Sequence, residues 1–366
     1  MSFQFDRKVK VAAVQHGPVL KDAPDWFDLD ATMDKAVRLI EEAGREGASL
    51  VVFPECWMPC FPYWSMDFSD QLTFMNIWAK YFCSSIEVPG RETEELCAAA
   101  KRAGTYVALG INERDRRFPG RMYNSILYLS PRGEVLGTHR KICNTVQERF
   151  FHSPGDGGDN LRTVFNTEIG NIGGSICGEH LQLPMVYYWL LQGIQIHCSL
   201  WPGMAGLEST TDNRTRSVCG ATRAFGVLAA TYMSEKNIPK NFYKNALFNT
   251  PRGLRGGSGI INPQGDYIAG PVYDEETIVY GEINLLDTIK ARSVTYIAGI
   301  YSRWDLFSLN VRQEPYEPFV PMEAPPGSAL PVLPGESTKD LEERIKLLER
   351  QLAAFSRGAK PGPDTA

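Results

Sequence analysis

The sequence predicts an α/β protein, and three observations support that prediction. Short runs rich in Val, Ile and Leu alternate along the chain with stretches whose apolar residues recur at helical spacing. Several of these runs are continuous, which is typical of strands buried on both faces. With 366 residues, 43% of them hydrophobic and 22% charged, the chain is long enough to bury a large layered core. Length alone leaves open two domains or one large domain with a tail.

In the first half, strands and helices follow one another. Residues 9–15 predict a Val-rich strand, and residues 29–46 predict a helix with one apolar face. The segment SLVVFPE at 49–55 predicts a buried strand that must stop at Pro54, because proline has no N–H for the ladder. Glu55 therefore lies at the carboxyl edge of a strand. The further expected elements are a helix at 91–103, strands at 105–110 and 124–130, and a strand that runs into His139, Arg140 and Lys141.

The second half of the sequence shows the same alternation of predicted strands and helices. The segment EIGNIGGSIC at 168–177 predicts a strand, and a helix at 184–193 and a buried strand at 194–200 follow it. Cys177 thus lies where a strand ends and a helix begins. The later strands are expected at 226–232, 258–263 and 278–284. No linker separates the halves and no repeat of fixed period is present, which argues against solenoids and propellers.

The composition changes after residue 312, so we expect one large domain at 1–312 and a separate tail at 313–366. Residues 313–336 contain seven prolines and predict an extended arm. Residues 337–355 predict a short helix whose seam has coiled-coil spacing. The seam residues are Leu341, Ile345, Leu348, Leu352 and Phe355. The helix could pack on its own domain or join subunits, and the last residues are expected to be disordered.

Charge and composition exclude several classes of function. A net charge of -5 supplies no basic field that would attract nucleic acid or an anionic membrane. No apolar run reaches the roughly 18 residues that a membrane span needs. The charged N-terminal segment, with Asp6, Arg7, Lys8 and Lys10, does not resemble a signal peptide. The eight cysteines are scattered and fit reduced thiols, so a cytoplasmic location is expected.

Cys177 in GGSICGEH is the best candidate for a nucleophile. A strand-to-helix turn projects its thiol from the sheet edge, near backbone N–H groups that favour a thiolate and an oxyanion. Ser175 is a weaker candidate, because Gly173 to Cys177 lacks the final glycine of a G-x-S-x-G elbow.

Two acidic residues and a lysine complete the candidate set. Glu55 at a buried strand end must be neutralised, paired or catalytic, since an unpaired buried carboxylate is costly. Lys141, at another strand end, is a candidate partner and could stabilise an anionic intermediate. Glu148 lies seven residues after Lys141, and it is a candidate only in combination with the other residues of this set.

At these positions the sequence resembles the nitrilase superfamily of carbon–nitrogen hydrolases, which carries a Glu, a Lys and a Cys, each after a buried strand. The three segments are VVFPECWMPCFPYW, HRKICNTVQERFFHSPGDG and CGEHLQLPMVYYWLLQGIQIHCSLWPG, and all three look like the nitrilase branch. The segment YSRWD at 301–305 is also similar to a late motif of the family. The resemblance spans roughly residues 9–312.

The resemblance implies a fold and an activity. The fold would be a four-layer α-β-β-α sandwich of the nitrilase type, assembled as a homo-oligomer that is a dimer or a larger spiral. The activity would be hydrolysis of a small-molecule organic nitrile to a carboxylic acid and ammonia, with no metal or organic cofactor. An amidase or carbamoylase of the same superfamily is the alternative enzyme, and a catalytically silent oligomeric scaffold is the alternative that is not an enzyme.

The resemblance also implies roles for individual residues. Cys177 would carry the thioimidate and thioester, with Glu55 as general base. Lys141 and the backbone N–H of Gly178 would stabilise the tetrahedral species, and Glu148 would orient Lys141 or position substrate. The expected substrate-binding residues are Tyr63, Trp64, His180 and Trp201. Nitrilases usually carry Trp where this chain has Gly178, and that departure predicts a wider pocket and some amide by-product.

Other motifs are weaker. Cys56 and Cys60 have no second ligand pair, and the five histidines show no ligand spacing, so no zinc site is expected. The glycine-rich segment at 253–259 lacks the lysine of a phosphate-binding loop, and we expect a mobile loop there.

Overall fold

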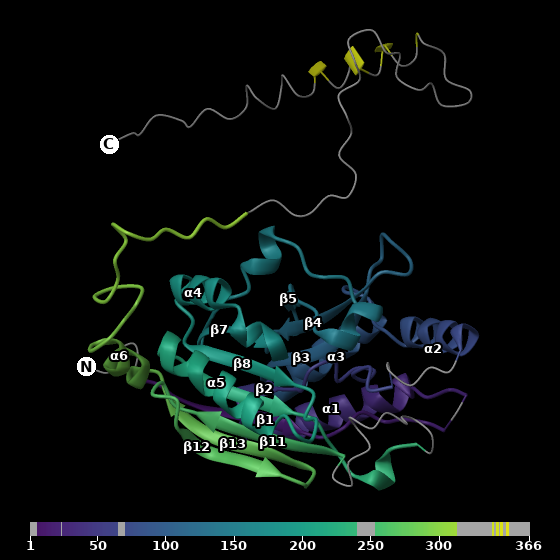
Figure 1. The fold of residues 1–366 in the computed structure, drawn as a ribbon, viewed down its shortest axis with the longest axis horizontal. Helices are drawn as coiled ribbons and strands as arrows, with labels where there is room; N and C mark the ends of the chain where they lie inside the picture. Colours follow the sequence, from purple (N-terminus) through teal and green to yellow (C-terminus); the bar gives the residue numbers. More distant parts are fainter. Residues whose placement is uncertain are drawn as a thin grey trace. The chain divides into compact units, whose positions relative to one another are not determined.

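The structure is a computed structural model that describes residues 6–22, 24–64, 70–239 and 253–312 (Figure 1). Beyond these ranges it describes only Lys339, Glu342, Glu343, Ile345, Lys346, Glu349 and Arg350, which are helical. The chain divides into two compact units, Met1–Tyr316 and Glu317–Ala366. The predicted arm at 313–336, most of the helix at 337–355 and the chain end lie outside the described residues. The domain boundary at 312 and the role of that helix therefore stay predictions.

In its described residues, the first unit contains two β-sheets, and the first of them has six strands. In spatial order these are β13 (Thr277–Asn284), β1 (Lys8–Gln15), β2 (Leu50–Val52), β3 (Tyr106–Arg114), β4 (Met122–Leu129) and β5 (Val135–Arg140). β1, β2 and β3 are parallel to one another, and β13, β4 and β5 join them antiparallel. Continuous burial of β2 explains why this strand reads as an unbroken apolar run.

The second sheet has seven strands within the described ranges. In spatial order they are β10 (Tyr232–Met233), β11 (Leu254–Ile261), β9 (Phe225–Ala230), β8 (Ile196–Trp201), β7 (Gly170–Ile176) and β6 (Phe165–Thr167), with β12 (Tyr267–Tyr273) paired to β11. β7, β8 and β9 form the parallel centre of this sheet. The two sheets together account for the two similar halves expected from the sequence. The mobile loop expected at 253–259 is wrong, because residues from Leu254 onward belong to β11, which pairs with β9 and β12.

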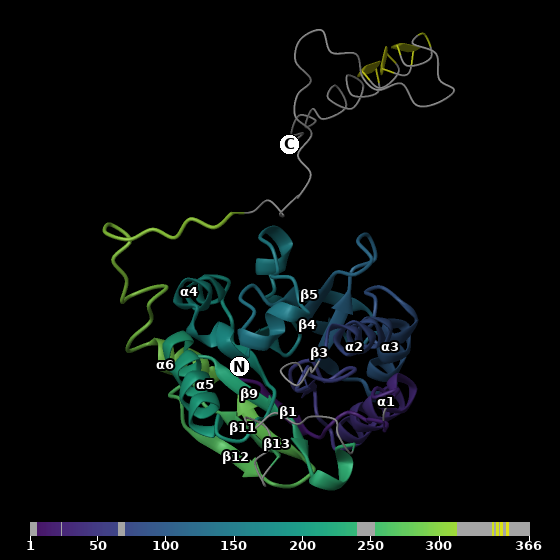
Figure 2. The same cartoon turned by 45° about the vertical axis from the view of Figure 1, so that its right-hand side comes forward.

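The sheets pack face to face, and helices cover their outer faces (Figures 1 and 2). Val11 and Val52 of the first sheet lie in one apolar cluster with Ile176 and Leu200 of the second. α1 (Leu29–Arg45) and α3 (Arg91–Ala103) pack on the outer face of the first sheet. α4 (Leu183–Leu191) and α5 (Glu208–Thr222) cover the second. The predicted α-β-β-α sandwich is confirmed.

Three helices were not expected from the sequence: α2 (Gln71–Cys83), α5 and α6 (Leu286–Arg292). The buried side chains of α5 have helical spacing, but threonine supplies most of them, so no apolar period marks the helix. They are Thr211, Thr215, Val218, Cys219 and Thr222. α2 buries only Ile77 and Tyr81 and leaves Leu72 and Met75 exposed, so its apolar residues follow no single face.

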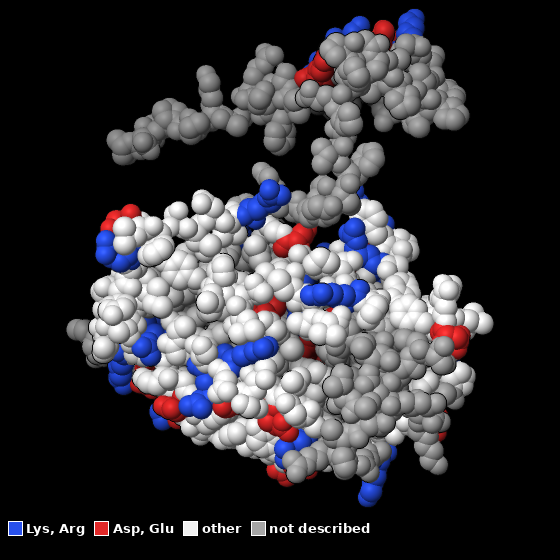
Figure 3. All heavy atoms as spheres, in the orientation of Figure 1, with Lys and Arg blue, Asp and Glu red and all other residues white. Residues whose placement is uncertain are grey.

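The surface carries both signs of charge. On the face shown in Figure 3, Lys and Arg atoms lie among Asp and Glu atoms across the described residues. Among those residues, no helix has both the length and the apolar character that crossing a bilayer requires.

Candidate active site

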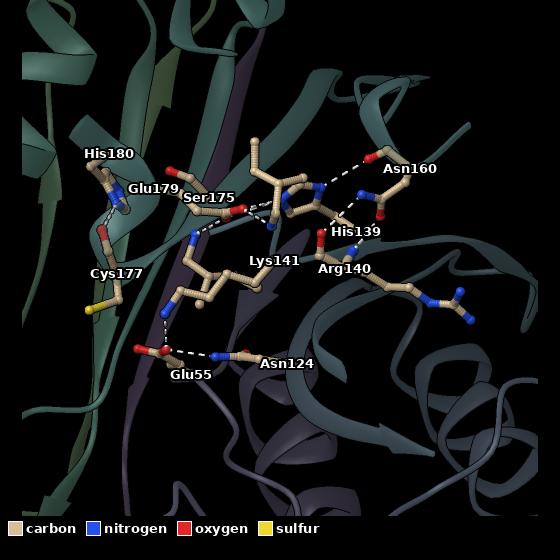
Figure 4. Close-up of polar contacts among 12 residues, drawn as sticks. Glu55, Asn124, His139, Arg140, Lys141, Asn160, Ser175, Cys177, Glu179 and His180 are labelled. Atoms are coloured by element: carbon tan, nitrogen blue, oxygen red, sulfur yellow. Dashed lines mark hydrogen bonds and ion pairs between the residues drawn. The ribbon is translucent and has the colours of Figure 1, made fainter. Parts of the chain in front are cut away.

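The ends of three strands bring the predicted catalytic residues together. Glu55 lies just beyond β2, Lys141 directly follows β5, and Cys177 directly follows β7. Figure 4 shows the Cys177 thiol, the Lys141 ammonium and the Glu55 carboxylate grouped at these ends. Glu148, on a short 3-10 helix at Val146–Phe150, contacts the same lysine. The structure therefore joins four residues that lie up to 122 positions apart in the sequence.

Lys141 is the centre of a fully buried charge cluster. Its Nζ donates to Glu55 Oε1 at 2.9 Å and to Glu148 Oε1 and Oε2 at 2.8 and 2.7 Å. None of the three side chains is exposed to solvent. We call these residues the Glu55–Lys141–Glu148 cluster. Two carboxylates around one ammonium leave one negative charge in excess, so the surrounding hydrogen bonds decide which carboxylate holds a proton.

Asn124 and Thr145 supply those hydrogen bonds, and the sequence analysis missed both. The Asn124 side-chain nitrogen donates to Glu55 Oε1 at 2.7 Å and to Glu148 Oε1 at 2.6 Å. Thr145 donates to Glu148 Oε2 from its backbone N at 2.7 Å and its hydroxyl at 2.5 Å. Glu148 thus accepts several hydrogen bonds that favour its ionised form, whereas Glu55 Oε2 has no partner among the described residues.

This asymmetry separates the two carboxyl groups. Burial raises the pKa of Glu55 to about 8, and the negative charge of Glu148 adds to that rise against the attraction of Lys141. Burial alone would also raise the pKa of Glu148, but the Lys141 charge and the hydrogen bonds lower it overall. Burial acts to lower the pKa of Lys141, yet both glutamates raise it well above its usual value. Glu148 and Lys141 are therefore fixed as ions, and Glu55 is the group that can exchange a proton near neutral pH.

Cys177 occupies a strained backbone position next to this cluster. Its φ is +47°, in the left-handed region that non-glycine residues rarely adopt. Burial raises the pKa of its thiol well above the usual range, and the Glu55 charge raises it further. Lys141 and the backbone N–H of Gly178 act in the opposite direction. The resting thiol is consequently protonated, and its activation requires a nearby base.

The turn that carries Glu55 is held against β3. Phe53 donates its backbone N–H to Ala108 O at 2.8 Å, and the N–H of Met58 donates to Gly110 O at 3.2 Å. A Cβ on Gly110 would overlap the carbonyl oxygen of Pro54. Glycine at this position lets the turn approach the strand closely enough to aim Glu55 at Lys141.

Gly178 faces the loop that carries Glu148. A Cβ placed on Gly178 would lie 2.7 Å from Cγ2 of Thr145. The rotamer of Thr145 is fixed by its hydrogen bond to Glu148. The space next to the nucleophile is therefore coupled to the placement of Glu148.

The four predicted substrate-binding residues are all buried. The Tyr63 hydroxyl donates to Pro202 O at 2.7 Å, and Trp64 packs against Phe27 and Tyr81. Their contact with substrate stays a prediction.

His180 and Trp201 lie behind the nucleophile, in a buried polar network. His180 Nδ1 is 2.7 Å from the Cys177 carbonyl oxygen, and its Nε2 is 2.7 Å from Ser199 Oγ. Trp201 stacks on the His180 ring and donates to Ser199 Oγ at 2.9 Å. Burial lowers the pKa of His180 to about 4, so this ring is neutral and its Nδ1–H donates to the nucleophile's own carbonyl. A direct substrate role for these two residues also stays a prediction.

A further cavity of about 590 Å³ lies beside the edge strand β5. Arg140, Asn160 and Arg162 line it, and the lining includes neither Lys141 nor Cys177. Among the described residues, no group of three or more His, Cys, Asp or Glu side chains is arranged to hold a metal ion.

Comparison with known proteins places the chain in a family. Residues 10–293 match the family model described as Carbon-nitrogen hydrolase. A protein named Nitrilase 2, from an unknown prokaryotic organism, is 34% identical over 301 residues, which cover 80% of this chain and 91% of that protein. A protein named Nitrilase, from Penicillium rubens, is 31% identical over 339 residues, which cover 89% of this chain and 99% of that protein.

Solved structures share the fold. Nit3 of Saccharomyces cerevisiae, a member of branch 10 of the nitrilase superfamily, aligns with a TM-score of 0.62 and 21% identity, over 84% of this chain and 99% of that one. An amidase of the nitrilase superfamily from Nesterenkonia aligns with a TM-score of 0.54 and 15% identity, over 77% of this chain and 93% of that one. The expected resemblance to the superfamily is confirmed.

Proposed function

The chain belongs to the carbon–nitrogen hydrolase family and is a hydrolase of carbon–nitrogen bonds, and we propose that its substrate is an organic nitrile. One nitrile and two waters would yield one carboxylic acid and one ammonia. The observation that carries the proposal is the buried Glu55–Lys141–Glu148 cluster beside the protonated thiol of Cys177. The nitrilase names of relatives at 31 and 34% identity support the choice of a nitrile.

In the first half of the proposed reaction, Cys177 adds to the nitrile carbon. Glu55, in its ionised form, accepts the thiol proton and transfers it to the nitrile nitrogen, so a neutral thioimidate forms. The raised pKa of Glu55 suits this role, because a base whose pKa lies near the working pH can both take and give a proton.

In the second half, two waters complete the hydrolysis. Glu55 activates the first water, which adds to the thioimidate carbon and gives a tetrahedral species. Expulsion of ammonia leaves a thioester, and the second water releases the carboxylic acid and restores the thiol. The Lys141 ammonium and the Gly178 backbone N–H would stabilise the tetrahedral species, as fixed donors in a dry site can. Loss of the Cys177 thiolate in place of ammonia would release the amide by-product.

Glu148 would act on Lys141 rather than on substrate. Its two oxygens both accept from the ammonium, and Thr145 and Asn124 hold the carboxylate in place. Lys141 therefore stays charged and fixed in place.

Ammonia release from paired substrates tests this function. Aliphatic, aryl and arylacetonitriles would be assayed beside their matching amides, with Cys177→Ala as control and the products separated. We expect ammonia and acid from at least one nitrile, and none with the variant. Ammonia from amides alone would move the protein to the amidase branch, and no ammonia from either would leave carbamoyl compounds or a silent scaffold.

We also propose that the protein is a homo-oligomer. Exposed apolar side chains gather on α4, its flanking residues and the segment after α6, and the ring contact of Tyr187 with Trp304 joins the two segments. These side chains are Leu181, Leu183, Leu191, Val294, Ile297, Ile300, Tyr301, Trp304, Leu306 and Phe307. Exposed apolar side chains on adjoining segments are typical of a surface that another protein covers, and a second copy is the simplest occupant.

We propose a cytoplasmic location because of the state of the cysteines. All eight are free thiols in the structure, and reduced thiols are typical of a reducing compartment.

A further inference from the structure

The reacting groups come from both sheets, so some contact must fix the two sheet edges relative to each other. Lys141 follows β5 of the first sheet, and Cys177 follows β7 of the second. The carboxylate of Glu179 lies between these strand ends (Figure 4). It accepts from the backbone N of Ile142 at 2.7 Å on Oε1, and from the backbone N of Ile176 at 2.9 Å on Oε2.

These two backbone groups adjoin the reacting residues. Ile142 directly follows Lys141, and Ile176 directly precedes Cys177. One rigid carboxylate therefore sets the separation of the lysine from the thiol. A shift of about 1 Å in such a separation can cost about a hundredfold in rate.

His139 supplies a third contact and completes an ion pair. Its Nε2 lies 3.0 Å from Glu179 Oε2, and its Nδ1 lies 3.0 Å from the carbonyl oxygen of Asn160. Both ring nitrogens thus face acceptors. A neutral imidazole has only one N–H, so the doubly protonated ring satisfies both contacts. Burial acts to lower the pKa of His139, but the charge of Glu179 raises it overall.

Neither side chain of this ion pair is exposed. A buried ion pair contributes little net stability, since an apolar pair of the same volume often packs as well. What it does provide is a fixed geometry with charged hydrogen bonds on three sides. This pair lies between the two strand ends that carry Lys141 and Cys177. A fixed geometry at that place can hold the two reacting residues relative to each other.

We propose that Glu179, charge-paired with His139, is a positioning residue that holds the Lys141 strand end and the Cys177 turn at their working separation. The roles of Lys141 and Cys177 in this statement rest on the proposed function. Glu179 itself touches neither substrate nor the reacting atoms, and acts through the backbone beside them.

The first test is Glu179→Gln. Glutamine keeps the shape, but its NH2 group must face at least one of the N–H donors that the carboxylate accepts. We expect kcat to fall at least about tenfold while KM changes by less than about threefold, because geometry in the transition state is lost and binding is not.

Glu113→Gln is the matched control. Glu113 is a buried carboxylate that pairs with Arg140, on the same strand as His139, and accepts from Ser125 at 2.7 Å. Among the described residues, its side-chain partners are Arg140 and Ser125, and neither belongs to the Cys177 turn. We expect Glu113→Gln to lower the melting temperature comparably and to leave kcat within about threefold of wild type.

Alkylation separates this inference from the proposed function, because it needs no substrate. The rate at which iodoacetamide modifies Cys177 would be followed by peptide mass spectrometry, with the exposed Cys83 as internal reference. Glu179→Gln should slow the alkylation of Cys177 and leave the alkylation rate of Cys83 unchanged. If no nitrile is hydrolysed but Cys177 slows in this way, the positioning role survives and the nitrilase function fails.

If Glu179→Gln does not fold, His139→Gln tests the proposal in its place. The double variant tests whether Glu179 and His139 act as a pair. We expect His139→Gln to lower kcat and the alkylation rate less than Glu179→Gln does, and the double variant to lose no more than Glu179→Gln alone. A folded Glu179→Gln with wild-type kcat and alkylation rate would overturn the proposal. Equal losses in Glu113→Gln, or an undisturbed alkylation rate in His139→Gln, would overturn it as well.

Discussion

The lack of room for a Cβ between Gly178 and Thr145 gives a prediction at the residue scale. A side chain at 178 meets Cγ2 of Thr145 and so disturbs the residue that holds Glu148. We expect Gly178→Ala to lower kcat about tenfold, and Thr145→Ser to have little effect, because serine keeps the hydroxyl and lacks the methyl. The double variant should regain most of the loss in a steady-state assay with one nitrile. A double variant as slow as Gly178→Ala would show that the methyl contact is irrelevant.

The separated pKa values of the two glutamates predict the pH dependence. Glu55 must be ionised to accept the thiol proton, and its pKa is raised to about 8, so kcat/KM should rise as pH increases through that value. The negative charge of Glu148 contributes to that raised pKa, so Glu148→Gln should move the rising limb to lower pH while it lowers the maximum. Profiles of kcat/KM at constant ionic strength measure both effects. A limb that moves to higher pH would contradict the assignment of Glu55 as the base.

Single residues also show what the sequence could predict about the site. Glu55 and Cys177 each follow a mostly buried strand, where a reactive side chain stands out from its apolar neighbours. Lys141 follows the largely half-buried strand β5, so only its place at a strand end marks it. Asn124 lies within β4 and faces the cluster by strand alternation alone, so no spacing marks it. Thr145 lies in a loop whose path only the fold determines.

The turn after β2 supplies a prediction at the scale of elements. β3 can lie against this turn because Gly110 has no Cβ to meet Pro54. We expect Gly110→Ala to lower the free energy of unfolding by about 1–3 kcal/mol or more, since backbone atoms cannot move aside as a side chain can. It should also lower kcat, because the turn carries Glu55.

The control for this prediction is Gly220→Ala in α5. A Cβ there meets only Gln264 O at 3.6 Å, an ordinary contact. Alanine also favours the helix over glycine by about 1 kcal/mol. In urea denaturation, the free energy of unfolding of Gly220→Ala should therefore equal or exceed that of wild type. That of Gly110→Ala should be well below the wild-type value. The reverse order would show that the turn tolerates displacement.

Elements differ in how well the sequence predicts them. α1 and α3 have apolar faces of regular period, and the expected ranges of 29–46 and 91–103 match Leu29–Arg45 and Arg91–Ala103 closely. α5 buries a face of threonines against the sheet, and threonine carries no hydrophobic signal in a sequence. The pairing of strands into two sheets, and the convergence of three strand ends, are tertiary features that local patterns do not contain.

For the whole molecule, the exposed apolar surface around α4 predicts self-association. Leu183 is 72% exposed and Phe307 is 74% exposed, on the two segments that Tyr187 and Trp304 join. Leu183→Glu with Phe307→Glu should reduce the sedimentation coefficient, because each buried charge in an interface is costly. Leu72→Glu, on the exposed side of α2, is the control and should leave it unchanged. Identical sedimentation of all three proteins would place the interface elsewhere.

The central claim is that Cys177 forms a covalent adduct with a nitrile during hydrolysis. The most direct test is to quench the enzyme in acid during steady-state turnover of a nitrile and to map the modified peptide by mass spectrometry. The account predicts an acyl or imidoyl adduct of the substrate's mass on Cys177, which is absent from Cys177→Ala together with ammonia release. An adduct on another residue, or ammonia release that persists in Cys177→Ala, would contradict it.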